Sequence, residues 1–197
     1  MMRPAVFSLC LLLGACAQPT LRGSGDLGLV IERASGSVQI VESSGMTELA
    51  RIEGLGDLSH ASAVFSRDQR YAYVFARDGG LTKVDLLTQR IAKRIIQGGN
   101  SIGGAISQDG RLIAVSNYQP GGVKVFDAVT LEQVADIPAT PLANGKRSRV
   151  VGLVDAPGQR FVFSLFDTGE IWSADFSHGN TPTLTRFTGI GEQPYDA

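Results

Sequence analysis

The sequence predicts an all-β fold, a β-propeller built from four-stranded blades. A segment made of an apolar strand, a polar turn and a β-branched strand recurs three times, starting at Phe65, Ile106 and Val154, which are 41 and 48 residues apart. Short alternating strands separated by turn residues fill the chain, without the 3.6-residue apolar stripe of an amphipathic helix. A repeat of about 40–45 residues is typical of a propeller blade.

Each repeat predicts four strands in a fixed order. An apolar strand and a β-branched strand are joined by an Asp-Gly-type turn. A glycine turn then leads to a third strand that ends in Asp, and an outer strand such as residues 131–137 completes the unit. The third strand recurs at residues 81–85, 122–127 and 170–175, with a weaker copy at residues 36–42. One partial unit therefore precedes three recognisable ones, and we assign residues 28–197 to the propeller domain.

The N-terminus has the features of an export signal. Arg3 precedes an apolar run, residues 5–13, that is too short to span a bilayer and suits the core of a signal peptide. The small residues that follow it, directly before Cys16, resemble the lipobox of bacterial lipoproteins. The resemblance implies that residues 1–15 are a signal peptide, that Cys16 carries a lipid, and that residues 16–27 link this anchor to the propeller. We therefore expect a membrane-anchored lipoprotein of the periplasm, and Ala17 is compatible with transfer to the outer membrane.

The composition excludes several function classes. A net charge of −1 does not favour non-specific binding to nucleic acid. The sequence contains no haem-attachment CxxCH, no HExxH, no phosphate-binding loop and no GxSxG elbow. Of the 18 basic residues, 14 are Arg, whose planar fork of donors suits carboxylates. This bias fits either a ligand rich in carboxylates or an ordinary Arg-rich surface.

The repeats predict which residues meet at one rim of the propeller. His60, Ser101 and Arg149 stand five residues before equivalent points of three inner strands. Because neighbouring strands are antiparallel, the ends of the second strands return to the same rim. This rim is predicted to contain six aligned residues and three neighbours: His60, Ser101, Arg149, Arg77, Tyr118 and Asp167, with Asn100, Arg147 and Ser148.

Two interpretations of this rim stay open at this point. Polar residues that differ between repeats fit a binding face, whereas blade rims are also polar simply because they are solvated. A binding role is better supported for His60 than for the other rim residues. It falls at the predicted axis near Arg77 and Arg149, and it is one of only two histidines. His178 lies in a predicted outer loop, where we expect it only to be exposed.

The motifs resemble a known family. Residues 60–85, with a His, a Gln-Arg-Tyr turn, Arg-Asp-Gly-Gly and a strand ending in Asp, are similar to the opening of the d1 domain of cytochrome cd1 nitrite reductase. Residues 112–137 look like the next blade of that domain. The resemblance is closer to the NirF family of haem d1 biosynthesis proteins. The stretches that carry it are residues 21–28, 54–60, 98–111 and 148–158.

The resemblance implies an eight-bladed periplasmic propeller that binds haem d1 or its precursor, dihydro-haem d1, during maturation of nitrite reductase in denitrification. The chain would then be the N-terminal half of that propeller, because eight blades need about 340 residues. Expected partners are nitrite reductase, other haem d1 maturation proteins and, through the lipid, the membrane.

The resemblance also implies roles for individual residues. His60 matches the axial iron ligand, Arg77 matches an arginine near the carboxylates of the macrocycle, and Asn100 falls near another such arginine. Asp155 and residues 194–196 occupy the stretches where the reductase has its distal histidines. We also expect Arg147, Arg149 and Tyr118 to contact the tetrapyrrole. The strand register puts Asp155 on the face opposite His60, so its role rests on the resemblance alone.

Three functions remain open from the sequence. The protein binds the cofactor in haem d1 biosynthesis and also modifies it, with Asp155 or a rim residue accepting a proton. Alternatively, it is a non-enzymatic carrier that delivers the cofactor to the nitrite reductase apoprotein. A weaker alternative is a propeller scaffold that binds protein partners without a cofactor.

Overall fold

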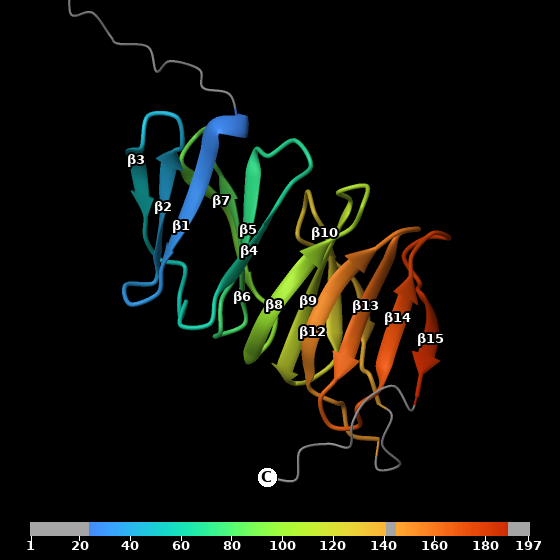
Figure 1. The fold of residues 1–197 in the computed structure, drawn as a ribbon. Coiled ribbons are helices and arrows are strands. Elements are labelled where there is room, and N and C mark those ends of the chain that lie inside the picture. Colours follow the sequence, from blue (N-terminus) through green and yellow to red (C-terminus); the bar gives the residue numbers. More distant parts are fainter. Residues whose placement is uncertain (1–23, 141–144, 189–197) are drawn as a thin grey trace, which may run out of the picture.

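The computed structural model describes residues 24–140 and 145–188, which form four antiparallel sheets arranged side by side in chain order (Figure 1). The described part begins with a short 3-10 turn, η1 (Ser24–Asp26). The first sheet contains β1 (Leu27–Glu32), β2 (Ser37–Glu42) and β3 (Thr47–Ile52). The second contains β4 (Ser62–Phe65), β5 (Tyr71–Phe75), β6 (Gly80–Asp85) and β7 (Arg90–Ile96).

The third and fourth sheets repeat the pattern of the second. The third contains β8 (Asn100–Ile106), β9 (Leu112–Gln119), β10 (Val123–Asp127) and β11 (Gln133–Ile137). The fourth contains β12 (Val150–Ala156), β13 (Arg160–Leu165), β14 (Ile171–Asp175) and β15 (Thr183–Phe187). Within each sheet, every strand pairs with the strand next to it in the chain, so each four-stranded sheet is a meander. The prediction of one partial and three complete units is therefore confirmed.

The recurrent Ser-x-Asp sequence forms the turn between the first two strands of a blade. In the second sheet, the hydroxyl of Ser66 accepts a hydrogen bond from the Tyr71 amide at 2.9 Å and donates to Asp68. In the third sheet, the hydroxyl of Ser107 accepts the equivalent hydrogen bond from the Leu112 amide, also at 2.9 Å. Side chains of this kind satisfy backbone groups that a tight turn leaves unpaired. The aspartates of these turns are thus structural, as the sequence predicts.

Apolar side chains fill the space between neighbouring sheets. All six residues of β6 are buried, and the largest fully buried side chains include Phe75, Phe161 and Phe163. The inner strands β4, β8 and β12 are only partly buried, and β8 contacts both of the others. Burial therefore holds the blades together through their middle strands, while the inner strands remain accessible.

Gly104 marks the closest approach between the second and third sheets. A Cβ atom at this position would lie inside van der Waals contact with the Phe75 ring and the Ala114 carbonyl oxygen. The preceding residues of β8 contain a register irregularity, as is common where a glycine interrupts a strand. The missing side chain lets the Phe75 ring pack against the inner strand of the next blade.

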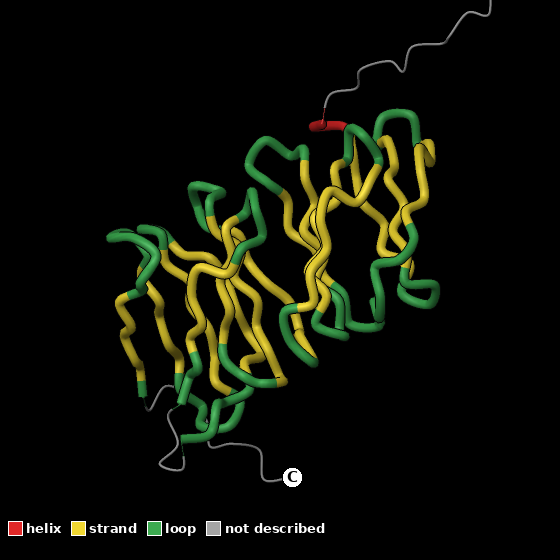
Figure 2. The backbone as a smooth tube through the Cα atoms, turned by 180° about the vertical axis from the view of Figure 1, so that it is seen from behind, coloured by secondary structure: helices red, strands yellow, loops and turns green. Residues whose placement is uncertain are grey.

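Loops lie at the two ends of the sheets, as seen from behind in Figure 2. The predicted binding rim and the Ser-x-Asp turns occupy opposite ends. Within the described residues there is no helix with the length and apolar character needed to cross a bilayer. The predicted signal peptide, Cys16 and residues 189–197 lie outside the described residues.

Candidate functional site

A pocket of about 460 Å³ opens at the rim that the repeats predict. Six residues line it: His60, Arg77, Asn100, Ile102, Tyr118 and Val151. Four of these six were expected at the rim from the alignment of the repeats. The structure thus brings together residues from three different blades.

The antiparallel meander explains why these residues meet. His60 comes just before β4, and Arg77 comes just after β5, so the two lie at the same end of the second sheet. Asn100 begins β8 and pairs with Gln119 of β9, next to Tyr118. The third sheet therefore presents Asn100 and Tyr118 at the corresponding end.

His60 is exposed and belongs to the loop of residues 57–61, which we call the His60 loop. Leu58 is fully buried, and its carbonyl oxygen accepts a hydrogen bond from the Ala61 amide at 3.0 Å. Asp57 accepts a hydrogen bond from the Ser59 amide at 2.9 Å, and its carbonyl oxygen accepts one from the Arg77 amide at 2.8 Å. The loop is thus anchored by two buried apolar side chains, Leu58 and Ala61, and by a backbone contact to the second sheet.

The surroundings of Asp57 are cationic. Hydrogen bonds from the hydroxyl and amide of Ser59 lower the pKa of Asp57, and the charges of Arg77 and His60 lower it further. The Arg77 side chain is exposed and makes no ion pair within the part of the chain that the structure describes. A guanidinium group in this position is available to a carboxylate of a ligand.

Asn100 lines the same pocket and carries an unsatisfied polar atom. Its Oδ1 atom is buried and has no hydrogen-bond partner in the structure. A buried polar atom that lacks a partner is costly, unless a ligand or water completes its hydrogen bond. The pocket lining therefore includes an exposed cation, Arg77, and an amide side chain whose oxygen has no partner among the described residues.

Ile102 and Val151 form the apolar part of the pocket and were missed in the sequence analysis. They lie on the inner strands β8 and β12, and Val151 is exposed. The sequence did contain a signal for them. Ile102 comes two residues after Asn100 and Val151 two residues after Arg149, and alternate residues of a strand face the same side. Apolar walls with a few polar groups are typical of small-molecule sites.

Arg149 reaches the rim but is occupied by the protein itself. Its Nη2 donates to Oδ1 of Asp167 at 2.7 Å, and its guanidinium lies over the Phe166 ring, 4.2 Å from the centroid. The Tyr118 ring lies on the same guanidinium at 5.6 Å. The hydrogen bond with Asp167 raises the pKa of Arg149 and lowers that of Asp167. Arg149 therefore supports Tyr118 from outside the pocket lining.

Arg147 is likewise engaged. Its two terminal nitrogens donate to the two oxygens of Asp136 at 2.7 and 2.9 Å. The hydrogen bond to Asp136 raises the pKa of Arg147. Like Arg149, Arg147 is not among the residues that line the pocket. Of the three predicted arginines, only Arg77 lines it.

Two predicted rim serines have structural roles. Ser101 is buried, and its hydroxyl donates to the Ala76 carbonyl oxygen at 2.6 Å, which joins the second and third sheets. Ser148 is also buried, and its backbone accepts a hydrogen bond from Gly122 at 2.9 Å. The Ser101 side chain and the Ser148 backbone thus join neighbouring blades beside the pocket.

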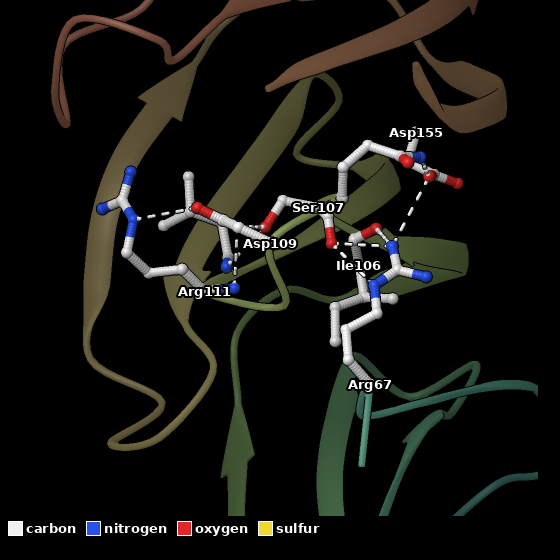
Figure 3. Close-up of polar contacts among 8 residues, drawn as sticks. Arg67, Ile106, Ser107, Asp109, Arg111 and Asp155 are labelled. Atoms are coloured by element: carbon white, nitrogen blue, oxygen red, sulfur yellow. Dashed lines mark hydrogen bonds and ion pairs between the residues drawn. The ribbon is translucent and has the colours of Figure 1, made fainter. Parts of the chain in front are cut away.

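Asp155 lies at the other end of the sheets, among the turns (Figure 3). It accepts a hydrogen bond from Gln108, and Oδ2 is 3.6 Å from Nη2 of Arg67. Arg67 in turn donates to the carbonyl oxygens of Ile106 and Ser107 at 3.1 and 2.7 Å. The structure does not bring Asp155 to His60. It places Asp155 in a bridge between the second, third and fourth sheets.

The remaining histidine and the acidic residues do not add a second site. His178 is exposed in the turn after β14, as expected. Hydrogen bonds from Ser177 lower the pKa of the nearby Asp175. Within residues 24–140 and 145–188, no three His, Cys, Asp or Glu side chains are grouped so that they could hold a metal ion.

Comparison with known proteins shows the family. The model of the cytochrome D1 heme domain family matches residues 22–197. The chain belongs to this family. It is 76% identical over its whole length to protein NirF of Pseudomonas aeruginosa and covers 50% of that protein. It is 75% identical to protein NirF of Stutzerimonas stutzeri, over 94% of this chain and 48% of that protein. The chain thus spans about half the length of these relatives.

Solved structures support the fold and extend the relationship. The dihydro-heme d1 dehydrogenase NirN in complex with DHE superposes with a TM-score of 0.80 and 31% identity, over 88% of this chain and 37% of that chain. A hydrazine synthase from Kuenenia stuttgartiensis matches the fold alone, with a TM-score of 0.63 and 15% identity over 91% of this chain and 53% of that one. The predicted all-β propeller architecture is confirmed.

Proposed function

We propose that the protein binds haem d1 or dihydro-haem d1 in the biosynthesis of haem d1, and that the pocket around His60 forms part of the binding site. The observation that carries this proposal is the convergence of His60, Arg77 and Asn100 on one pocket with an apolar wall. The likeness to a dihydro-heme d1 dehydrogenase in complex with DHE supports the choice of ligand. NirF proteins, at 75–76% identity, support the place in haem d1 biosynthesis.

The residues present fit such a group. The exposed imidazole of His60 can coordinate an iron ion from one side. Arg77 can bind a peripheral carboxylate through charge-assisted hydrogen bonds, and Asn100 adds a polar amide to the lining. Ile102 and Val151 can pack against an apolar macrocycle edge. When bound, the haem would supply the iron centre and its redox chemistry.

A titration of the full-length protein with isolated haem d1 tests this proposal. We expect His60→Ala to weaken binding and to change the Soret spectrum, because the imidazole ligand is lost. His178→Ala is the matched control, since it removes the exposed histidine that lies outside the pocket. An unchanged spectrum and affinity in His60→Ala would show that His60 is not the ligand.

A second candidate function is that of a carrier, which holds the cofactor for nitrite reductase and does not convert it. The position of Asp155 favours it, because this candidate proton acceptor lies at the end of the sheets opposite the pocket. Incubation with an excess of dihydro-haem d1, followed by mass spectrometry, distinguishes the two functions. A carrier retains one equivalent without a mass change, whereas an enzyme converts the excess.

The proposed site of action is the periplasm, with the protein attached to a membrane through Cys16. The support is the lipobox resemblance, which lies outside the described residues. Inhibition of lipoprotein signal peptidase is expected to leave a larger precursor, and Cys16→Ser is expected to abolish lipid labelling. Unaltered size and labelling would contradict the anchor.

A further inference from the structure

Arg33 contacts the His60 loop from the neighbouring blade. It lies in the turn between β1 and β2, and its Nη1 donates to the Ser59 carbonyl oxygen at 3.1 Å. Its Nη2 donates to the Ala61 carbonyl oxygen at 3.5 Å. Ser59 and Ala61 are the residues on either side of His60. One guanidinium group therefore binds the backbone both before and after the imidazole.

We propose that Arg33 is a positioning residue for His60. The inference rests on the proposed function, because it gives His60 the role of ligand. No hydrogen bond of the His60 side chain occurs within the described chain, so its direction depends on the backbone of its loop. The two carbonyl groups that Arg33 binds belong to the two residues flanking His60. Fixing both restricts the rotation of the segment that carries the imidazole.

Arg33 adds to the other supports of the loop. The side chain of Leu58 anchors the start of the loop in the core, and the Asp57 carbonyl oxygen accepts a hydrogen bond from the Arg77 amide. Both contacts lie on the N-terminal side of His60. On the C-terminal side, Ala61 is buried and its amide donates to the Leu58 carbonyl oxygen at 3.0 Å. Arg33 adds a contact with the Ala61 carbonyl oxygen from a different sheet. The first blade thereby helps to shape a pocket whose lining comes from the other three.

The chemistry of the side chain suits this task. A guanidinium group has several donors in a rigid plane, so it can serve two acceptors that are separated in space. A lysine ammonium group is a single point charge and would serve one carbonyl at a time. Arg33→Lys is therefore expected to retain only part of the effect, and Arg33→Gln to lose it.

The first experiment measures the loop without any ligand. In the ligand-free full-length protein, Arg33→Gln is expected to increase amide hydrogen exchange of residues 58–61, and Arg33→Lys to increase it less. Arg90→Gln is the matched control, because Arg90 is an exposed arginine of β7 that makes no ion pair in the described part of the chain. Equal exchange in Arg33→Gln and the parent protein would overturn the inference.

The second experiment tests whether Arg33 acts through His60. We expect Arg33→Gln to weaken haem d1 binding by about two- to fivefold, the range for an exposed charge-assisted hydrogen bond, and to shift the spectrum toward a mixture of ligated and unligated iron. In the His60→Ala background, the same substitution is expected to cause no further loss. An equal loss in both backgrounds would show that Arg33 acts independently of His60.

The two proposals fail in different ways. If His60→Ala leaves the affinity and the Soret spectrum unchanged, the ligand assignment is wrong and the positioning role of Arg33 falls with it. If His60→Ala abolishes ligation while Arg33→Gln changes neither exchange nor spectrum, only the inference about Arg33 is overturned.

Discussion

Arg149 and Asp167 form an ion pair beside the pocket, in which both the Nε and the Nη2 atom of Arg149 donate to Oδ1, at 3.1 and 2.7 Å. The Arg149 amide donates to the other oxygen at 2.8 Å. The guanidinium also covers the Phe166 ring. The carboxylate of Asp167 thus already balances the charge of Arg149. Arg77 differs, because it forms no ion pair in the described chain.

This difference predicts unequal effects on ligand binding. Arg77→Gln is expected to weaken haem d1 binding about tenfold, since it removes the one arginine that lines the pocket. Arg149→Gln is expected to weaken it only about twofold, through a looser Tyr118 ring. Parallel titrations of the two variants measure this. A larger effect of Arg149→Gln would mean that Arg149 leaves Asp167 to bind the ligand.

The same ion pair predicts a loss of stability in acid. The hydrogen bond from Arg149 lowers the pKa of Asp167 below its ordinary value of 3.8, so the folded state favours the charged carboxylate. This contribution is present above about pH 4 and is lost as the pH falls through the lowered pKa. For a partly exposed pair it amounts to about 0.5–1 kcal/mol. Asp167→Asn is expected to reduce the free energy of unfolding at pH 7 but much less at pH 2.5, as measured by urea denaturation. Equal losses at both pH values would contradict this origin.

Tyr73 predicts a second pH dependence, at the alkaline end. Its hydroxyl is buried and donates to the Ala128 carbonyl oxygen at 2.7 Å, and burial raises its pKa to about 12. Because the folded pKa is raised, the stabilisation is complete below about pH 10 and is lost as the pH rises toward 12, by about 2 kcal/mol.

Tyr73→Phe separates this effect from the hydrogen bond itself. The variant is expected to be less stable than the parent at pH 8 by about 1 kcal/mol, and to lose less stability between pH 10 and 12. Lys83, which also donates to Ala128, has a pKa lowered chiefly by burial, and its titration acts in the opposite direction. Stability curves of parent and variant that stay parallel above pH 10 would show that Tyr73 is not responsible.

The bridge formed by Arg67 predicts a loss of stability without a loss of binding. Arg67→Ala removes the hydrogen bonds to Ile106 and Ser107 and the contact with Asp155, and is expected to cost about 1–2 kcal/mol. The affinity for haem d1 is expected to stay the same, because the bridge lies at the end of the sheets opposite His60. Thermal unfolding and titration of the same sample test both parts. A weaker affinity with unchanged melting would contradict a purely structural bridge.

The sequence by itself determined the blade pattern and most of the pocket. Alternation of apolar residues and the turn sequence Ser-x-Asp depend on neighbours a few residues apart, so the repeats could be aligned. Once they are aligned, antiparallel pairing requires that His60 and Arg77 share one end of a sheet, with Tyr118 at the corresponding place. The resemblance to the d1 domain added the proposal of haem d1 as the ligand and of His60 as the residue that binds its iron.

Only the tertiary structure decided which polar groups are free. Arg77, Arg147 and Arg149 look alike in the sequence, yet the last two are bound by Asp136 and Asp167. Arg33 gives no signal in the repeats, because its partners are carbonyl oxygens about 26 and 28 residues away. Contacts of this kind depend on how one blade sits against the next. Packing between blades is set by the shapes of many buried side chains together, and no local pattern encodes it.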